Sequence, residues 1–161
     1  MLSRVADNLY WTGRYLERAE HTARLIEVNL QLMLDQTHIA AERRWGRVLT
    51  AVRCDEPESD REDGLDAARA TAFLAFDQDN DKSVCGSIAR ARENVRQVRE
   101  QVSTDMFEQL NALYHRTRQA RFDDIWNAGP VDFFRSLRSG LHQFHGVTDA
   151  SMDHGEAWEF I

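Results

Sequence analysis

The residues best suited to chemistry lie in the segment that begins the chain. Glu17 and Glu20 are three positions apart and Arg24 follows four positions later, so in a helix these side chains would share one face. Two neighbouring carboxylates can act as acid and base, or as metal ligands. Ion pairs with arginines at helical spacing are the simpler interpretation, and we favour it. The candidate polar site on this segment comprises Tyr10, Arg14, Glu17, Arg18, Glu20 and Arg24.

A second group of charged residues lies later in the chain, where arginines recur at successive helical turns. The group comprises Arg92, Glu93, Arg96 and Arg99. Its arginines could bind an anion or pair with carboxylates of an adjacent helix; a solvated face neutralised by Glu93 is the alternative. Gly13 would cost a helix about 1 kcal/mol relative to alanine, which suggests close approach of a neighbouring helix. We therefore expect Glu17 and Glu20 to contact one of these arginines across a helix–helix interface.

Histidine and cysteine do not show the spacing of a metal centre. A di-iron bundle requires Glu-x-x-His pairs on facing helices, and the nearest approximations are Asp35-x-x-His38 and His142-x-x-His145. These are interpreted as surface or packing residues, so no metal and no cofactor is expected. Cys54 and Cys85 form no disulfide framework and indicate a reducing, cytoplasmic compartment. Cys85 is interpreted as a small buried residue, although a place in a first helical turn could make its thiol reactive.

Composition and charge exclude several classes of function. The net charge of −7 argues against general affinity for nucleic acid. No apolar run of about 18 residues is present, so no membrane span is expected, and the amino terminus lacks the apolar stretch of a secretory signal. Because no glycine-rich phosphate loop, Ser-His-Asp order or Cys-x-x-Cys pair occurs, the chain is not an obvious stand-alone ligase or hydrolase.

Hydrophobic spacing predicts an all-α fold, a bundle of about five to seven helices in one domain over residues 1–161. Apolar residues recur in steps of three and four over 2–36, which predicts a long central helix. Ser83 is a candidate helix cap, and proline after Gly129 suits a first helical turn. Further helices are expected over 39–52, 65–74 and 84–102, from Thr104 or Asp105 onward, from Pro130 onward and from Ser151 onward.

Two stretches carry a resemblance to a known family. Residues 1–24, MLSRVADNLYWTGRYLERAEHTAR, are similar to the opening of alpha-E proteins. Residues 91–103, ARENVRQVREQVS, and the following 106–111, MFEQLN, resemble another block of that family, with Phe107 where tryptophan is typical. The turn at 76–80, FDQDN, also matches, so the resemblance covers most of the chain.

The alpha-E resemblance implies an all-helical bacterial protein encoded beside an ATP-grasp amide ligase and a transglutaminase-like peptidase. From it we expect an accessory or scaffold protein in peptide ligation or turnover; an enzyme with a Glu/Arg active site and a purely structural helical dimer are the alternatives. The resemblance also implies a second motif after a lead-in like residues 155–161, so that the chain would be an amino-terminal half. Expected partners are therefore a second copy, a second alpha-E half, or the ligase or peptidase. Exposed Trp158 and Phe160 would support such association.

Overall fold

A computed structural model describes residues 3–33, 38–54 and 65–151. Within these ranges the chain forms seven α-helices and no strand, which confirms the all-α prediction. The α-helices are α1 Ser3–Leu32, α2 His38–Ala51, α3 Ala67–Thr71, α4 Val84–Gln97, α5 Thr104–Gln119, α6 Phe122–Ala128 and α7 Pro130–Ser151. A π-helical turn, Ala72–Phe76, extends α3, and a 3-10 turn, Arg99–Gln101, follows α4.

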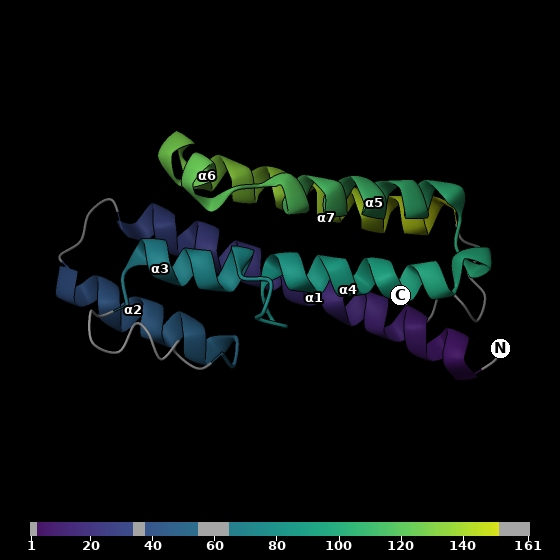
Figure 1. Cartoon of the computed structure of the whole chain (residues 1–161), viewed down its shortest axis with the longest axis horizontal. Coiled ribbons are helices and arrows are strands. Elements are labelled where there is room, and N and C mark those ends of the chain that lie inside the picture. The colour runs from purple at the N-terminus through teal and green to yellow at the C-terminus, as the bar shows by residue number, and fades with distance from the viewer. Residues whose placement is uncertain (1–2, 34–37, 55–64, 152–161) are drawn as a thin grey trace.

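The helices form two layers, with α2 flanking one end. Helix α1 packs along α4 and also against α7, while α5 packs against both α4 and α7. Figure 1 shows α5, α6 and α7 above α1, α3 and α4, with α2 below the end of α1 that is remote from the amino terminus. The long first helix is central, as predicted from its apolar residues, because it contacts α2, α4 and α7.

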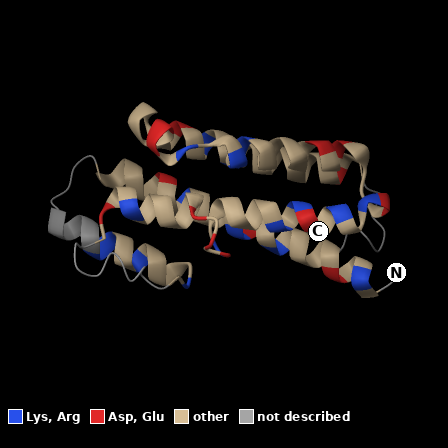
Figure 2. Cartoon of the chain, in the orientation of Figure 1, with Lys and Arg blue, Asp and Glu red and all other residues tan. Residues whose placement is uncertain are grey.

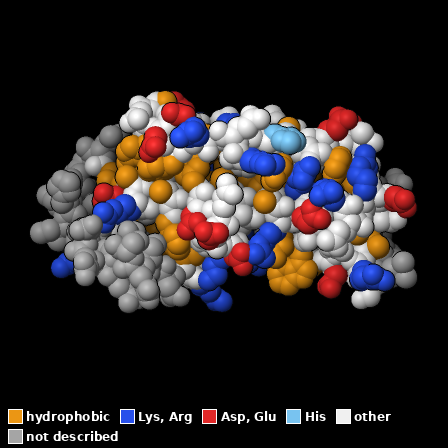
Figure 3. Space-filling model, in the orientation of Figure 1, with side chains coloured by type: hydrophobic (Ala, Val, Ile, Leu, Met, Phe, Trp, Pro, Cys, Tyr) orange, Lys and Arg blue, Asp and Glu red, His pale blue; other side chains and the backbone are white. Residues whose placement is uncertain are grey.

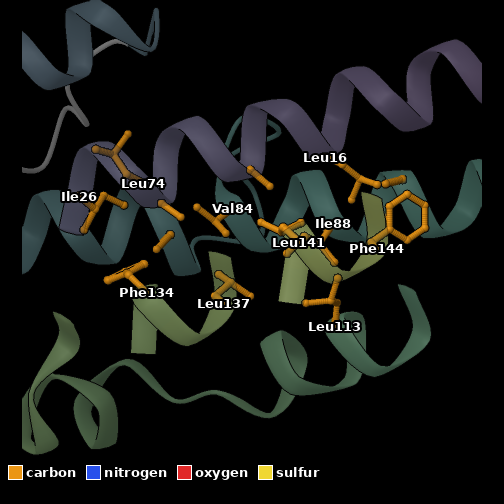
Figure 4. Packing of buried hydrophobic residues seen from close by; sticks show 14 of the residues in the cluster. Leu16, Ile26, Leu74, Val84, Ile88, Leu113, Phe134, Leu137, Leu141 and Phe144 are labelled. Atoms are coloured by element: carbon orange, nitrogen blue, oxygen red, sulfur yellow. The ribbon is translucent and has the colours of Figure 1, made fainter. Parts of the chain in front are cut away.

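The core lies between the layers and draws on every long helix. Leu16 and Ile26 of α1, Ile88 of α4 and Phe144 of α7 are fully buried and belong to one hydrophobic cluster. Figure 4 shows these side chains converging with Leu113 of α5 and Leu137 of α7. Helices α5 and α7 approach closely at Gly140, where an added Cβ would lie 2.6 Å from Leu113 Cδ2.

Side-chain caps place several helix boundaries where the sequence predicted them. Ser83 accepts a hydrogen bond from the Gly86 amide and caps α4, and Ser103 accepts one from the Met106 amide and caps α5. Gly129 has φ +104°, a conformation that glycine adopts without steric cost, and α7 begins at the next residue. Proline suits this position because the first helical amide has no acceptor within the helix.

Two helix boundaries and one additional helix differ from the predictions. The helix expected over 84–102 ends at Gln97, because the chain turns through Val98 and then enters the cap of α5; Val98 and Val102 are buried in that turn. Helix α6 was not predicted. Helix α7 continues to Ser151, where a new helix was expected to start. The residues beyond it, including Trp158 and Phe160, lie outside the described ranges.

Candidate functional site

A groove runs along α1 where α2 lies beside it. Its volume is about 570 Å³, within the range of about 300–1,000 Å³ that is typical of ligand sites. One wall is polar and comes from α1; the apolar remainder comes from both helices. The groove is lined by Arg14, Glu17, Arg18, His21, Thr22, Arg24, Leu25, Val28, Ala51 and Val52. Four of the predicted site residues, Arg14, Glu17, Arg18 and Arg24, are therefore brought together here.

The groove carries uncompensated positive charge. Glu17 is its single carboxylate, and it accepts a hydrogen bond from Arg14 Nη1 at 2.5 Å. Arg18 lies over the Tyr15 ring, with its guanidinium carbon 5.4 Å from the ring centroid. Among the described residues no carboxylate pairs with Arg18 or Arg24. Guanidinium groups in this situation favour carboxylate or phosphate ligands, which they can bind through two parallel hydrogen bonds.

Glu20 lies on the other side of α1, toward α7. Its Oε1 accepts a hydrogen bond of 2.8 Å from His142 Nε2, and its Oε2 lies 4.0 Å from His145 Nε2. The expected contact between the α1 carboxylates and the arginines of α4 is therefore wrong for Glu20, as it is for Glu17. The physical reason is that α1 packs against α4 and α7 on different faces, and the face that carries Glu20 meets α7.

The charged group on α4 contacts neighbours other than α1. Arg92 donates to Asn111 Oδ1 of α5 and lies over the ring of Tyr114, 4.4 Å from its centroid. Arg96 pairs with Glu93 within the same helix at 2.9 Å. Arg99 donates to the Val102 carbonyl and to Thr104, so it stabilises the turn between α4 and α5. These four predicted site residues thus do not join the groove.

A buried ion pair that the sequence did not reveal joins α1 to α7. Arg138 Nη1 donates to Glu27 Oε2 at 2.7 Å, and Arg135 Nε lies 3.7 Å from Glu27 Oε1. The Glu27 side chain is 8% exposed and that of Arg138 is 21% exposed. Glu20 and Glu27 are seven residues apart and so share one face of the helix. Together with their partners they form an α1–α7 charge ladder, which we define as Glu20 with His142 and His145, and Glu27 with Arg138 and Arg135.

The pKa of the Glu20 carboxyl is lowered from its ordinary value of 4.5. Burial is the largest single influence and raises this pKa, but the hydrogen bond from His142 and the charges of His142, His145 and His21 together outweigh it. Because the pKa is lower in the folded state than in the unfolded state, the ionised carboxylate stabilises the fold above about pH 4.5. That stability is lost as the pH falls through the folded-state pKa.

We therefore expect Glu20→Gln to be less stable than the unsubstituted chain at about pH 6, with the difference shrinking as the pH is lowered to about 3. Denaturant unfolding across this range measures the difference. As a control, Glu20→Gln can be introduced into a chain that already carries His142→Gln and His145→Gln. There it should change the pH dependence of stability far less, because the histidine partners of Glu20 are already absent. Parallel stability curves for Glu20→Gln and the unsubstituted chain would contradict the assignment.

The thiol of Cys85 is not an activated nucleophile. Cys85 lies in the first turn of α4, beside a cavity of about 340 Å³ between α4 and α5. Burial raises the pKa of this thiol to about 12, so the thiolate is scarce at neutral pH. Its Sγ lies 3.8 Å from the Thr117 carbonyl oxygen. The raised pKa argues against the alternative of a reactive first-turn cysteine. Cys85 is half-buried rather than fully buried, so the interpretation as a small buried residue holds only in part.

Tyr10, another predicted site residue, lies outside the groove at the amino-terminal end of α1. Its ring meets Trp11 edge to face with centroids 5.4 Å apart, and Trp11 lies 5.8 Å from Tyr15. Tyr10 and Trp11 are 47% and 43% exposed. The rings of Tyr10, Trp11 and Tyr15 thus form a row along α1. Arg18, which lies over Tyr15, connects this row to the groove.

These features define a helical bundle with a basic groove and without an arranged catalytic centre in the described ranges. Those ranges contain no group of three or more His, Cys, Asp or Glu side chains suited to a metal ion. Within the described residues, no helix is long and apolar enough to cross a membrane.

The chain belongs to the Alpha-E family, described as a predicted alpha-helical domain with a conserved ER motif, which matches residues 1–161. The match covers the whole chain and confirms the predicted resemblance to this family. Comparison with curated proteins and with solved structures finds no match. Of the two Glu-Arg dipeptides in the sequence, Glu17-Arg18 lies in the groove; the other is Glu42-Arg43.

Proposed function

We propose that this protein is an accessory binding component of a bacterial peptide-ligation or peptide-turnover system, acting in the cytoplasm with an ATP-grasp ligase. The observation that carries the proposal is the groove between α1 and α2, in which Arg14 pairs with Glu17 while Arg18 and Arg24 pair with no carboxylate of the described residues. A site of this kind can hold a peptide or a segment of a partner without reacting with it. The ligase itself is implied by the resemblance to alpha-E proteins.

The carboxylates of α1 are better suited to structure than to acid–base catalysis. A catalytic acid or base works best when its pKa lies near the operating pH, whereas the pKa of Glu20 is shifted in the opposite direction. Glu27 is buried against Arg138. Glu17 is about half-exposed and already paired with Arg14. These arrangements favour a binding role over an active site built from Glu17 and Glu20.

Reconstitution with the ATP-grasp ligase encoded beside an Alpha-E gene tests the proposal. We expect the chain to bind the ligase and to raise the rate of amide formation, without hydrolysing ATP on its own. Arg18→Gln and Arg24→Gln should reduce this stimulation. Glu20→Gln should preserve it when the rate is measured under conditions in which this less stable variant remains folded. Loss of product formation in Glu17→Gln or Glu20→Gln at unchanged binding would instead favour an enzyme.

The proposal also includes association of the chain with itself or with a second Alpha-E half. Val28 and Leu32, 42% and 51% exposed, provide apolar surface on α1 for such a contact. Light scattering at micromolar concentration distinguishes a monomer from a dimer, and the substitution Leu32→Ser would shift a dimer that uses this surface toward monomer.

A further inference from the structure

We infer that the ligand of the α1–α2 groove is an acidic peptide segment, in which carboxylates alternate with apolar side chains. This inference rests on the proposed function and names the class of molecule that the groove binds. It depends on three features of the groove: which charges remain available, where the apolar surface lies, and how far the surface extends.

The available charge is positive because every carboxylate of α1 from Glu17 onward already has a partner within the fold. Glu17 pairs with Arg14, Glu20 with His142, and Glu27 with Arg138. Glu20 is four residues from Arg24, a spacing at which the two could have paired, but it is directed to α7 instead. Arg18 and Arg24 therefore have no carboxylate partner among the described residues and can pair with a carboxylate of a ligand.

The apolar surface lies next to these arginines. Leu25 and Val28 of α1 lie in the same groove as Ala51 and Val52, and Val28 is 42% exposed. An exposed valine beside two guanidinium groups matches a ligand that presents an apolar side chain next to a carboxylate. A ligand with charge alone, such as inorganic phosphate, would leave this surface in water.

The surface extends beyond the first hollow. An adjoining hollow of about 340 Å³ shares Leu25 and Ala51 with the groove and adds Arg47 of α2, which is exposed. Positive charge thus recurs along the contact between α1 and α2, separated by apolar surface. A chain with several carboxylates can engage both hollows, whereas one compact anion can engage only one.

The charge of the rest of the protein favours a peptide over a nucleic acid. The net charge is −7, and both signs of charge occur in each helical layer in Figure 2. On the face shown in Figure 3, acidic and hydrophobic side chains lie among the basic ones. A nucleic-acid backbone needs a continuous run of basic side chains, whereas a short acidic peptide needs only the groove.

Fluorescence polarisation with a fluorescein-labelled peptide, Glu-Glu-Leu-Glu-Glu-Leu-Glu-Glu, tests the inference. We expect it to bind about tenfold tighter than the same peptide with glutamine in place of glutamate, and to weaken as salt is added. Arg18→Gln and Arg24→Gln should each weaken the acidic peptide by about tenfold. Glu17→Gln should strengthen it by about threefold, because Arg14 is released. Arg121→Gln, a matched loss of charge at an exposed residue outside the groove, should change nothing.

The outcomes separate this inference from the proposed function. Equal affinity for the acidic and glutamine peptides would overturn the acidic specificity, while leaving a groove that binds peptides. Tighter binding of a single-stranded oligothymidylate than of the acidic peptide would overturn the choice of a peptide. If neither peptide binds and Arg18→Gln still reduces stimulation of the ligase, the inference fails and the proposed function stands. If that stimulation is absent as well, both fail.

Discussion

Glu27→Ala is expected to lower the free energy of unfolding by about 3 kcal/mol, because it leaves Arg138 desolvated without its counter-charge. The carboxylate is 8% exposed and bridges Arg138 and Arg135. Arg138 Nε is buried and has no hydrogen-bond partner in the described part of the chain, so the guanidinium depends on Glu27 for its compensation. Because the pair joins α1 to α7, the loss affects the contact between the two layers.

Two comparisons separate this effect from a general loss of charge. Glu17→Ala removes a surface carboxylate that pairs with Arg14, where both side chains are about half-exposed, and should cost less than about 1 kcal/mol. Replacing both members of the buried pair, Glu27→Leu with Arg138→Leu, should restore stability to within about 1 kcal/mol. Urea denaturation of the four proteins measures these differences. A cost below about 1 kcal/mol for Glu27→Ala would show that the pair is effectively solvated.

Trp45→Ala is expected to cost about 4 kcal/mol and to free α2 from α1. Trp45 is fully buried, its Nε1 lies 3.2 Å from Met33 Sδ, and Val48 and Leu49 of the same helix are buried beside it. Since α2 provides Ala51 at the groove and Arg47 at the adjoining hollow, its release should also abolish binding of the acidic peptide. Hydrogen exchange across α2, read together with denaturation, measures both consequences.

The adjacent residue provides a matched control. Gly46 is exposed, and a Cβ added there meets no atom within 4 Å. Gly46→Ala should therefore stabilise α2 by up to about 1 kcal/mol, since alanine is the better helix former, and should leave peptide binding intact. Unchanged exchange of the α2 amides in Trp45→Ala would contradict the role of Trp45 as the anchor of this helix.

Much of the secondary structure could be predicted from the sequence, because it depends on local spacing. The three- and four-residue steps from Leu9 to Leu30 identify α1, and the serines before Val84 and Thr104 mark two helix starts. Such signals act within a few residues, so they do not require knowledge of the neighbours. The same reasoning failed for α6, whose seven residues are too few to display a helical period.

The site could be predicted only in part. The sequence was sufficient to place Arg14, Glu17, Arg18 and Arg24 near one another, because all four lie within about three turns of a single helix. His21 occupies the same groove and could have been included by its spacing. Ala51 and Val52 could not be predicted as part of the groove. They are about 25 positions or more away in sequence and reach the groove only because Trp45 anchors α2 against α1.

Which side chains neutralise one another was decided by tertiary structure alone. The sequence places Glu17 and Glu20 near one another on α1 and complementary arginines on α4, and the contact predicted from these facts names the wrong partner helix. Helical periodicity specifies the direction of a side chain around its own axis but not which helix packs there. Here α7 occupies that face, so His142 and Arg138, more than 100 residues away, pair with Glu20 and Glu27. Among the described residues, this pairing leaves Arg18 and Arg24 of the α1–α2 groove without a carboxylate partner.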